Sequence, residues 1–311
     1  MKIRKLLDSD LSELYKIADK VREDNVGDVI HIRALLEISN ICYRNCDYCG
    51  LRAENENLTR YAMTMQEIEI LGKKSFDLGY KTLVIQSGEN NFYHIDKLAE
   101  VVNNLSNYGT TVTLSLGELD YKHLKTLKEA GAKRYLLKFE TADKQIYSKL
   151  HKGYSLDGRL DCLRAIKELG YEVGSGFLVG LPNENLDSVA QNLALLEKLQ
   201  CDMAGIGVFI PHKDTPLRAL PCGSVQLTKK CVAITRILLP KCNIPITTSV
   251  GEFGDKYELF GGGANVIMQN ITPNVFADNY CIYPKKHSLT DMQKDRGKLV
   301  YDLINIGRKP I

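Results

Sequence analysis

Short runs of β-branched and aliphatic residues alternate along the chain with longer amphipathic stretches. The short runs predict eight strands, near 33–39, 81–87, 110–116, 133–139, 171–179, 202–208, 243–249 and 264–268. The amphipathic stretches predict helices near 65–78, 93–107, 121–130, 157–169, 186–199, 226–239 and 254–261. Strands and helices that alternate in this way over about 250 residues are typical of a single α/β domain, the (β/α)8 barrel of the TIM type.

An open, doubly wound sheet is the alternative arrangement of such elements. Its first strand–helix turn would normally carry a glycine-rich dinucleotide fingerprint, whereas that turn carries cysteines here. A further amphipathic helix is predicted over 5–24, and no Pro- or Ser-rich linker divides the chain. We therefore expect an N-terminal helical extension at 1–30 that covers the barrel, the barrel itself at 31–285, and a C-terminal tail at 286–311 packed on the barrel.

Composition and charge narrow the choice of partners. Apolar residues make up 44% of the 311 positions and charged residues 25%, both near the globular average. The formal net charge of +3 is too small to predict binding to nucleic acid or to a membrane surface. No apolar run reaches the length of a membrane span, and the first residues lack the apolar core of a secretion signal. We expect a cytoplasmic protein.

Nine cysteines are present, and three of them lie close together just after the first predicted strand. Cys42, Cys46 and Cys49 have the spacing C-x3-C-x2-C, in a loop that a barrel would place at its active, C-terminal face. Three thiolates on one short loop suit a [4Fe–4S] cluster whose fourth iron stays open to another ligand. A structural zinc site is the alternative, but the next candidate ligand, His94, has no paired partner nearby.

The triad, with the aromatic Tyr48 directly before its third cysteine, resembles the motif of the radical S-adenosylmethionine superfamily. The resemblance implies that the methionine amine and carboxylate of S-adenosyl-L-methionine chelate the open iron. It further implies that electron transfer cleaves the sulfonium to a 5′-deoxyadenosyl radical, with a one-electron reductant such as ferredoxin or flavodoxin. An aromatic residue at position 48 suits contact with a nucleobase, and plain packing is the alternative interpretation.

Longer segments resemble one branch of this superfamily, the [FeFe]-hydrogenase H-cluster maturase family HydE. They extend over nearly the whole chain and include 48–52, 60–64, 115–118, 209–212, 214–217, 235–240, 244–248 and 264–268. The resemblance implies an organometallic substrate, a cysteine-derived iron synthon bearing CO and cyanide, and other hydrogenase maturases as partners. Three alternatives stay open: a methylornithine synthase-like enzyme, a biotin synthase-like enzyme on a small amino-acid or sulfur substrate, and a non-catalytic iron–sulfur carrier.

Polar residues follow the later strands, where a barrel would turn them towards the cofactor. Ser87, Gly88 and Glu89 end the second strand and resemble the superfamily segment that binds the methionine amino group, although a turn with a solvated Glu would look the same. Glu140 ends the fourth strand and suits ribose hydroxyls or an ammonium group. Arg159 suits the methionine carboxylate, with a surface charge as the alternative.

Further candidates lie on the later half of the barrel. Gly176, in the glycine-rich fifth strand, suits either the close approach of the adenine edge or a bare barrel corner. The candidate substrate contacts are Ser115, Thr247, Thr248, Tyr280 and Tyr283. The threonines offer hydroxyl donors to an anion, and the tyrosines would close the cavity unless they simply pack in the core.

The sequence also departs from the HydE pattern. Residues 285–300 contain no cysteine, so a second iron–sulfur cluster is not expected. Lys138-Phe139 stands where a pair such as Arg-His is expected, and Gln269 stands where Pro is expected. An altered substrate, or a role outside hydrogenase assembly, therefore stays open.

The remaining cysteines and two histidines have plainer interpretations. We interpret the cysteines outside the triad as buried and inert: Cys162, Cys201, Cys222, Cys231, Cys242 and Cys281. His151 and His212 fall on connections on or near the active face, and a turn histidine is the plainer interpretation of His212.

Overall fold

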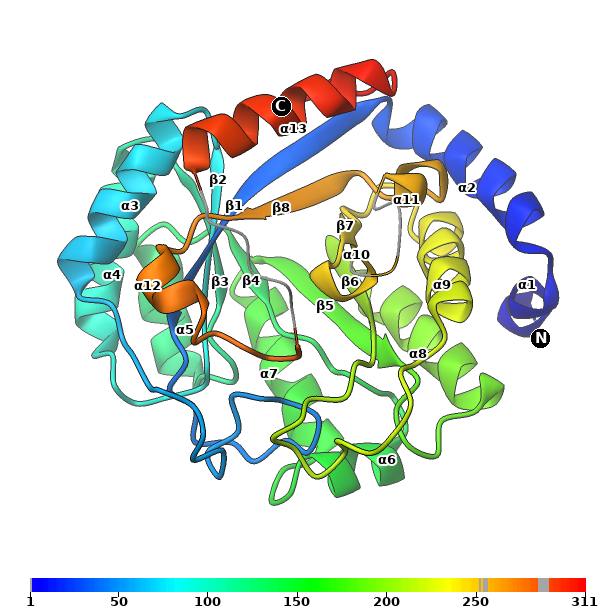
Figure 1. Cartoon of the computed structure of the whole chain (residues 1–311), viewed down its shortest axis with the longest axis horizontal. Helices are drawn as coiled ribbons and strands as arrows, with labels where there is room; N and C mark the ends of the chain where they lie inside the picture. Colours follow the sequence, from blue (N-terminus) through cyan, green and yellow to red (C-terminus); the bar gives the residue numbers. More distant parts are fainter. Residues whose placement is uncertain (1, 252, 254–256, 285–290) are drawn as a thin grey trace.

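The computed structural model describes residues 2–251, 253, 257–284 and 291–311. Within them, eight parallel strands are joined in the order β6-β5-β4-β3-β2-β1-β8-β7, and Figure 1 shows them at the centre of the molecule. Their bounds are β1 Val29–Ser39, β2 Thr82–Ser87, β3 Thr111–Ser115, β4 Arg134–Leu136, β5 Glu172–Val179, β6 Met203–Val208, β7 Pro245–Ile246 and β8 Val266–Asn270. The predicted (β/α)8 barrel is confirmed.

The ring closes between β6 and β7 mainly at the amino ends of these strands. Met203 and Asn243 form a parallel bridge there, and Asn243 N–H donates to the carbonyl of Asp202 at 2.8 Å. Nearer the carboxyl end, the Thr247 hydroxyl donates to the carbonyl of Ile206 at 2.9 Å, so a side chain stands in for backbone pairing. The strand predicted over 243–249 is shorter than expected because the chain turns into a helix directly after β7.

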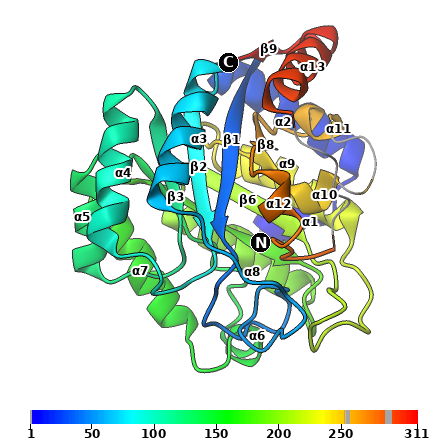
Figure 2. The ribbon, with the colours of Figure 1, turned by 60° about the vertical axis from the view of Figure 1, so that its left-hand side comes forward.

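Helices cover the outside of the barrel, as the second view in Figure 2 also shows. Those that follow the strands are α3 Met65–Asp77, α4 Ile95–Asn107, α5 Tyr121–Glu129, α6 Lys144–Leu150, α7 Leu156–Glu168, α8 Leu186–Leu199, α9 Val225–Leu238, α10 Thr248–Gly251, α11 Glu258–Gly261 and α12 Asn274–Ala277. In the described part of the chain, none is long and apolar enough to cross a membrane. Of the helix predicted over 254–261, residues 254–256 lie outside the described residues.

Local chemistry explains where these helices begin and which face they bury. Thr64 starts α3 with a reciprocal capping box, in which its side chain accepts from Glu67 N–H and the Glu67 carboxylate accepts from Thr64 N–H. On α4, Leu98, Val102 and Leu105 recur at helical spacing and are all buried. The short α6 was not predicted, because its seven residues show too little of the amphipathic period to be recognised.

The segments before and after the barrel meet at the start of β1. Before β1 come α1 Lys2–Asp8 and α2 Leu11–Val26, which pack against α8 and α9. After the barrel come α13 Met292–Asn305, which lies at the top of Figure 1 and contacts β9, and β9 Lys309–Pro310, which pairs in parallel with the start of β1. Arg308 binds Asp28 at 3.1 Å and Asp19 at 3.2 Å, which ties this junction together.

Side chains on the two faces of β1 serve different purposes, one face packing in the hydrophobic core under the helices and the other lining the cavity inside the barrel. Leu36 and Ile38 point outward into the hydrophobic core between the barrel and its helices. Leu35 and Glu37 point the other way and line a cavity inside the barrel. Because side chains alternate along a strand, the same run of sequence supplies both the packing and the site.

Candidate active site

The loop after β1, residues 40–62 and called the cysteine loop below, has little regular secondary structure and is fixed by side chains. Asn40 Nδ2 donates to the carbonyls of Thr59 at 2.8 Å and Asn279 at 2.7 Å. Arg60 Nη1 donates to the carbonyls of Asn40 at 2.7 Å and Leu51 at 2.9 Å. These donors satisfy carbonyls that no strand or helix pairs, so the loop follows one defined path at the carboxyl end of β1.

Cys42, Cys46 and Cys49 are free thiols on this loop. Burial, with a smaller contribution from the neighbouring Cys42, raises the pKa of Cys46 to about 12. Burial likewise raises the pKa of Cys49 well above its usual range, with Cys46 and Cys42 adding to the effect. The three thiols therefore lie near one another, and a bound metal would favour their thiolate form.

The donor set fits an iron–sulfur cube. Among the residues that the structure describes, no three His, Cys, Asp or Glu side chains are grouped to hold one metal ion. In a cube each thiolate binds its own iron, so three ligands are spread around the cluster instead of converging on one atom. A Cβ at Gly88 would meet the carbonyl oxygen of Ile41 and lie 2.8 Å from Cys42 Cβ. The end of β2 and the cysteine loop thus pack as closely as only glycine allows.

A buried network of charges lies beside the cysteine loop. Arg44 donates from Nε and Nη2 to Glu89 Oε1 at 2.7 and 2.5 Å, and its Nη2 lies 2.9 Å from Glu118 Oε2. Arg159 donates from Nε to Glu118 Oε1 at 2.5 Å and from Nη1 to the Lys138 carbonyl at 2.9 Å. Glu89 is 7% exposed and Arg159 is 8% exposed. The solvated turn and the surface charge that were the alternatives for these two residues are therefore wrong.

Glu140 adopts a backbone conformation that is rare for a residue with a side chain. Its φ is +64°, and the turn around it is closed by a 2.7 Å hydrogen bond from Thr141 N–H to the Phe139 carbonyl. β5 holds the turn on both sides, because Glu140 N–H donates to the Gly176 carbonyl and Leu178 N–H donates to the Glu140 carbonyl, both at 3.0 Å. Strain of this kind costs about 1–3 kcal/mol and clusters at functional sites.

A cavity of about 220 Å³ occupies the carboxyl end of the barrel. Four of the predicted site residues line it: Tyr48, Glu140, Thr247 and Tyr283. Lys138 also lines it, and its Nζ donates to Glu140 Oε2 at 2.9 Å. The structure thus brings together residues from the cysteine loop and from strands far apart in the sequence.

Several other predicted residues stand behind the cavity wall. Tyr280 is buried, and its hydroxyl accepts from Nε2 of Gln86, which lines the cavity, at 3.1 Å. Ser115 ends β3 and is paired in register with Gln86. The Ser87 hydroxyl donates to the Gly88 carbonyl at 2.7 Å. These residues lie around the site without lining its cavity.

The structure gives less for two more predicted residues. A Cβ at Gly176 would collide with the Gly205 carbonyl on β6, so close packing of two strands accounts for the glycine. Thr248 begins α10, and its side chain lies outside the described residues.

The sequence interpretation missed polar residues inside the barrel. Glu37 lines the cavity, is 4% exposed, and accepts from Asn270 Nδ2 at 2.9 Å. Gln86 and Ser249 line it as well. The period-two alternation along β1, with Leu35 inward, would have placed Glu37 inside the barrel.

The cysteines outside the triad form no disulfide, as predicted, but they do not share one environment. Cys162, Cys201, Cys231 and Cys242 are buried, whereas Cys281 is partly exposed and Cys222 is exposed. The prediction that all six are buried is wrong for these last two. For Cys222 the reason is its place in the irregular segment between β6 and α9.

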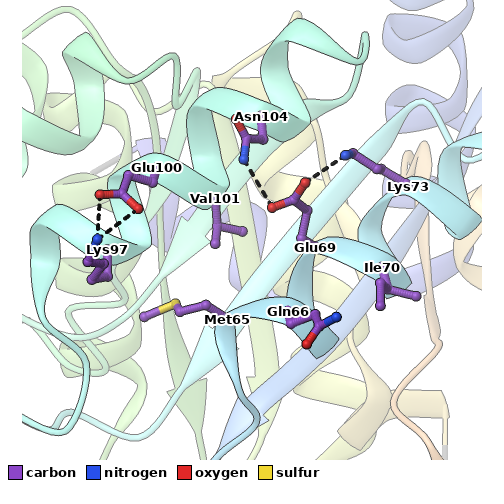
Figure 3. A pocket seen from close by; sticks show the side chains of 9 residues that line it. All are labelled: Met65, Gln66, Glu69, Ile70, Lys73, Lys97, Glu100, Val101 and Asn104. Carbon is purple, nitrogen blue, oxygen red and sulfur yellow. Dashed lines mark hydrogen bonds and ion pairs between the residues drawn. The ribbon is translucent and has the colours of Figure 1, made fainter.

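A second hollow lies on the outside of the molecule between α3 and α4, and Figure 3 shows its lining. Its charged groups neutralise one another within the two helices. Glu69 binds Lys73 at 2.6 Å and Asn104 at 3.0 Å, and Lys97 binds Glu100 at 2.8 Å. The cysteine triad lies elsewhere, on the loop after β1, so this groove is separate from the candidate active site.

Comparisons with known proteins agree with this geometry. The family model of the radical SAM superfamily matches residues 36–196. The [FeFe] hydrogenase maturase subunit HydE of Thermotoga maritima is 45% identical over 300 residues, which cover 96% of this chain and 86% of that protein. The 3-methylornithine synthase of Methanosarcina acetivorans is 27% identical over 306 residues, covering 97% and 86%. A crystal structure of methylornithine synthase (PylB) superposes with a TM-score of 0.88 at 28% identity, over 99% of this chain and 93% of that one.

Proposed function

The chain belongs to the radical SAM superfamily and, within it, to the HydE family of [FeFe] hydrogenase maturases, and from this premise we propose its reaction and its substrate. Membership implies a [4Fe–4S] cluster and S-adenosylmethionine. We assign the cluster to Cys42, Cys46 and Cys49. The observation that carries this assignment is the convergence of three free thiols on one loop at the carboxyl end of the barrel.

When bound, the cluster supplies one electron that cleaves S-adenosylmethionine to methionine and a 5′-deoxyadenosyl radical. The protein binds and orients the groups around it. Glu89 offers a buried carboxylate to the methionine ammonium, and Arg159 offers a guanidinium to the methionine carboxylate. Both side chains are already engaged, with Arg44 and Glu118 respectively, so each is held in place before the cofactor arrives.

Two further residues serve the adenosyl half of the cofactor in this proposal. Glu140 holds its carboxylate at the cavity, where it can accept hydrogen bonds from the ribose hydroxyls. The strained backbone of Glu140 supports this role, because backbone strain clusters at functional sites, where the surrounding structure holds a side chain in a required position. Tyr48 also lines the cavity and offers the flat face of its ring to the nucleobase.

The substrate occupies the cavity below the adenosyl group. We assign it as a cysteine-derived iron synthon with CO and cyanide ligands, because the chain belongs to the HydE family. The lining supports an amino-acid portion, since Lys138 offers a cation to a carboxylate, Thr247 a hydroxyl, and Glu37 an acceptor to an ammonium group. The cavity is walled by the apolar Leu35, Leu136, Leu178, Val208, Ile210, Ile246 and Met268, which exclude water from the radical.

A second candidate is a reaction of the methylornithine synthase type on a free amino acid. The superposition with PylB over nearly the whole chain favours it as the alternative. Both reactions require a one-electron donor such as ferredoxin or flavodoxin, and the first requires exchange of iron synthons with other hydrogenase maturases. None of the nine cysteines, which all lie in the described residues, forms a disulfide, and this suits the reducing cytoplasm that we propose as the compartment.

The test is anaerobic reconstitution with iron and sulfide, followed by reduction and measurement of 5′-deoxyadenosine. We expect a brown protein that forms this product from S-adenosylmethionine. A protein with a loaded cluster and no 5′-deoxyadenosine would disprove the proposal. Adding either lysine or a cysteine-bound iron carbonyl cyanide complex separates the two candidates, because only the true substrate is consumed in step with 5′-deoxyadenosine.

A further inference from the structure

The carboxyl end of α6 meets the cysteine loop between two of its cysteines. Asp47 N–H donates to the Leu150 carbonyl at 3.0 Å. The Tyr48 hydroxyl lies 2.8 Å from Nε2 of His151, and Lys152 Nζ lies 3.3 Å from Asp47 Oδ1. Three consecutive residues of one segment thus contact the two residues that separate Cys46 from Cys49.

The direction of the Tyr48 hydrogen bond follows from the other side of the imidazole. His151 Nδ1 lies 3.1 Å from the backbone carbonyl of Tyr147. A carbonyl can only accept, so Nδ1 carries the proton and Nε2 is the bare nitrogen. The Tyr48 O–H therefore donates to Nε2. Burial, with help from Arg159, lowers the pKa of His151 to about 3, which keeps this neutral form at ordinary pH.

Packing against two aromatic rings also holds the imidazole of His151 in place. The ring is stacked on Tyr147, with centroids 4.0 Å apart and planes at 17°, and it meets the Tyr48 ring edge to face at 5.4 Å. His151 is 1% exposed. A tyrosine ring has two torsions, and this arrangement fixes both by anchoring the hydroxyl at the far end of the side chain.

We propose that His151 is a positioning residue, which fixes the ring of Tyr48 as the wall against which the nucleobase of S-adenosylmethionine lies. This rests on the function proposed above. The segment that follows α6 thereby sets the position and tilt of Tyr48, the aromatic side chain between Cys46 and Cys49. The cofactor meets a preformed surface, and no ordering cost falls on its binding.

Two substitutions separate this role from a structural one. His151→Gln places an amide oxygen where Nε2 stands, so it keeps an acceptor for Tyr48 and loses the bond to the Tyr147 carbonyl. His151→Asn places its amide where Nδ1 stands, so it keeps the bond to the Tyr147 carbonyl and loses the acceptor. Tyr48→Phe removes the same hydrogen bond from the other partner. All are prepared with reconstituted clusters and matched by iron and sulfide content.

The measurement is the dissociation constant for S-adenosylmethionine on the oxidised, reconstituted protein, where no turnover occurs. We expect Asn to weaken binding about five- to tenfold, as for loss of one neutral hydrogen bond, Tyr48→Phe to do the same, and Gln to stay within about twofold of the wild type. The Tyr48→Phe/His151→Asn double variant should bind no more weakly than either single one. The EPR change that S-adenosylmethionine causes in the reduced cluster should broaden in the His151→Asn and Tyr48→Phe variants and stay as in the wild type in His151→Gln.

Three outcomes overturn the proposal: wild-type affinity in His151→Asn, equal loss in Gln and Asn, or effects of Tyr48→Phe and His151→Asn that add. A wild-type protein that carries a cluster and binds no S-adenosylmethionine would instead overturn the proposed function, and this inference with it. The control therefore shows which of the two has failed.

Discussion

Two hollows of this protein, the pocket at the barrel mouth that Arg44, Glu89 and Glu118 help to line and the groove between α3 and α4, differ in where their polar groups come from. In the groove, Glu69 and Lys73 are neighbours on one helix, and each stays partly exposed. At the barrel mouth, Arg44, Glu89 and Glu118 come from separate loops, and Arg44 and Glu89 are both buried where they meet. The groove's pairs form with local helix geometry, whereas the mouth's pairs exist only when the whole fold is complete. The candidate site is therefore distinguished from the groove by buried charged residues that converge from separate loops, and not by the size of the hollow.

The largest effect should come from the triad. Cys49→Ala removes one of three ligands, so reconstituted protein should hold little or no [4Fe–4S] cluster and form 5′-deoxyadenosine only at background level. The matched control is Cys222→Ala, which removes an exposed thiol and should change neither property. Iron and sulfide analysis with EPR of the reduced protein checks both. A Cys49→Ala protein with full cluster and activity would refute the ligand assignment.

The comparison of the two hollows can be tested directly by stability. Arg44→Met leaves Glu89 and Glu118 without their shared cation in a buried place, so the free energy of unfolding should fall by about 3–5 kcal/mol. Lys73→Met breaks an exposed pair on one helix and should cost about 0.5 kcal/mol or less. Urea unfolding of both variants measures these values. Equal losses would erase the distinction between the hollows.

Glu184 lies in neither hollow, and it allows the effect of burial on a carboxyl group to be measured apart from the effect of an ion pair. Burial raises the pKa of its carboxyl to about 7, and its Oε2 accepts from Gly180 N–H at 2.5 Å. Because the folded state keeps the proton while the unfolded chain loses it near pH 4.5, the stability that Glu184 contributes is greatest below pH 4.5 and is lost as the pH rises through 7.

The expected loss from this group is about 3 kcal/mol, at ~1.4 kcal/mol per pKa unit. Glu184→Gln keeps an acceptor for Gly180 and cannot ionise, so its stability should be flatter over this range. Unfolding free energies at pH 5 and pH 8 test the difference. A Gln variant with the same pH dependence as the wild type would show that another group is responsible.

The smallest effect concerns the strained turn at the cavity. Glu140→Gly and Glu140→Ala both remove the ion pair with Lys138, but only glycine accepts a φ of +64° without penalty. The Gly variant should therefore be more stable than the Ala variant by about 1 kcal/mol, while both lose affinity for S-adenosylmethionine. Thermal or urea unfolding compares the pair. Equal stability would mean that the turn is not strained.

The sequence predicted the barrel well because each strand carries its own local pattern. The apolar runs of β2 and β5 are as clear in the sequence as in the fold, and the cysteine spacing located the loop after β1. The strand at β7 was overestimated because Thr247 belongs to the pattern of apolar and β-branched residues yet uses its hydroxyl to bridge to β6. The sequence pattern alone does not distinguish a β-branched residue whose backbone pairs with the next strand from one whose side chain makes that contact instead.

The parts of the site that depend on the spacing of nearby residues, such as the cysteine triad, could be predicted from the sequence. The parts that depend on partners far away in the sequence could not. Arg159 and Glu118 are 41 positions apart, and nothing near either residue in the sequence announces their pairing. His151 and Tyr48 are 103 positions apart, and α6 was too short to be recognised. Gly176 shows the opposite error, since a glycine that suggested a ligand is explained by the approach of β6.

The pairing of β9 with β1 has a consequence for how the protein is made. Residue 311 bonds with its backbone to Ile30 and Ile32, at 2.9 Å in both cases. The first strand therefore waits for residues translated about 280 positions later before its outer end is paired. Synthesis on the ribosome can form the middle of the barrel early, but the seam between its two ends closes only after this segment has emerged. An edge left open for that long is where a nascent chain is most exposed to pairing with a neighbour.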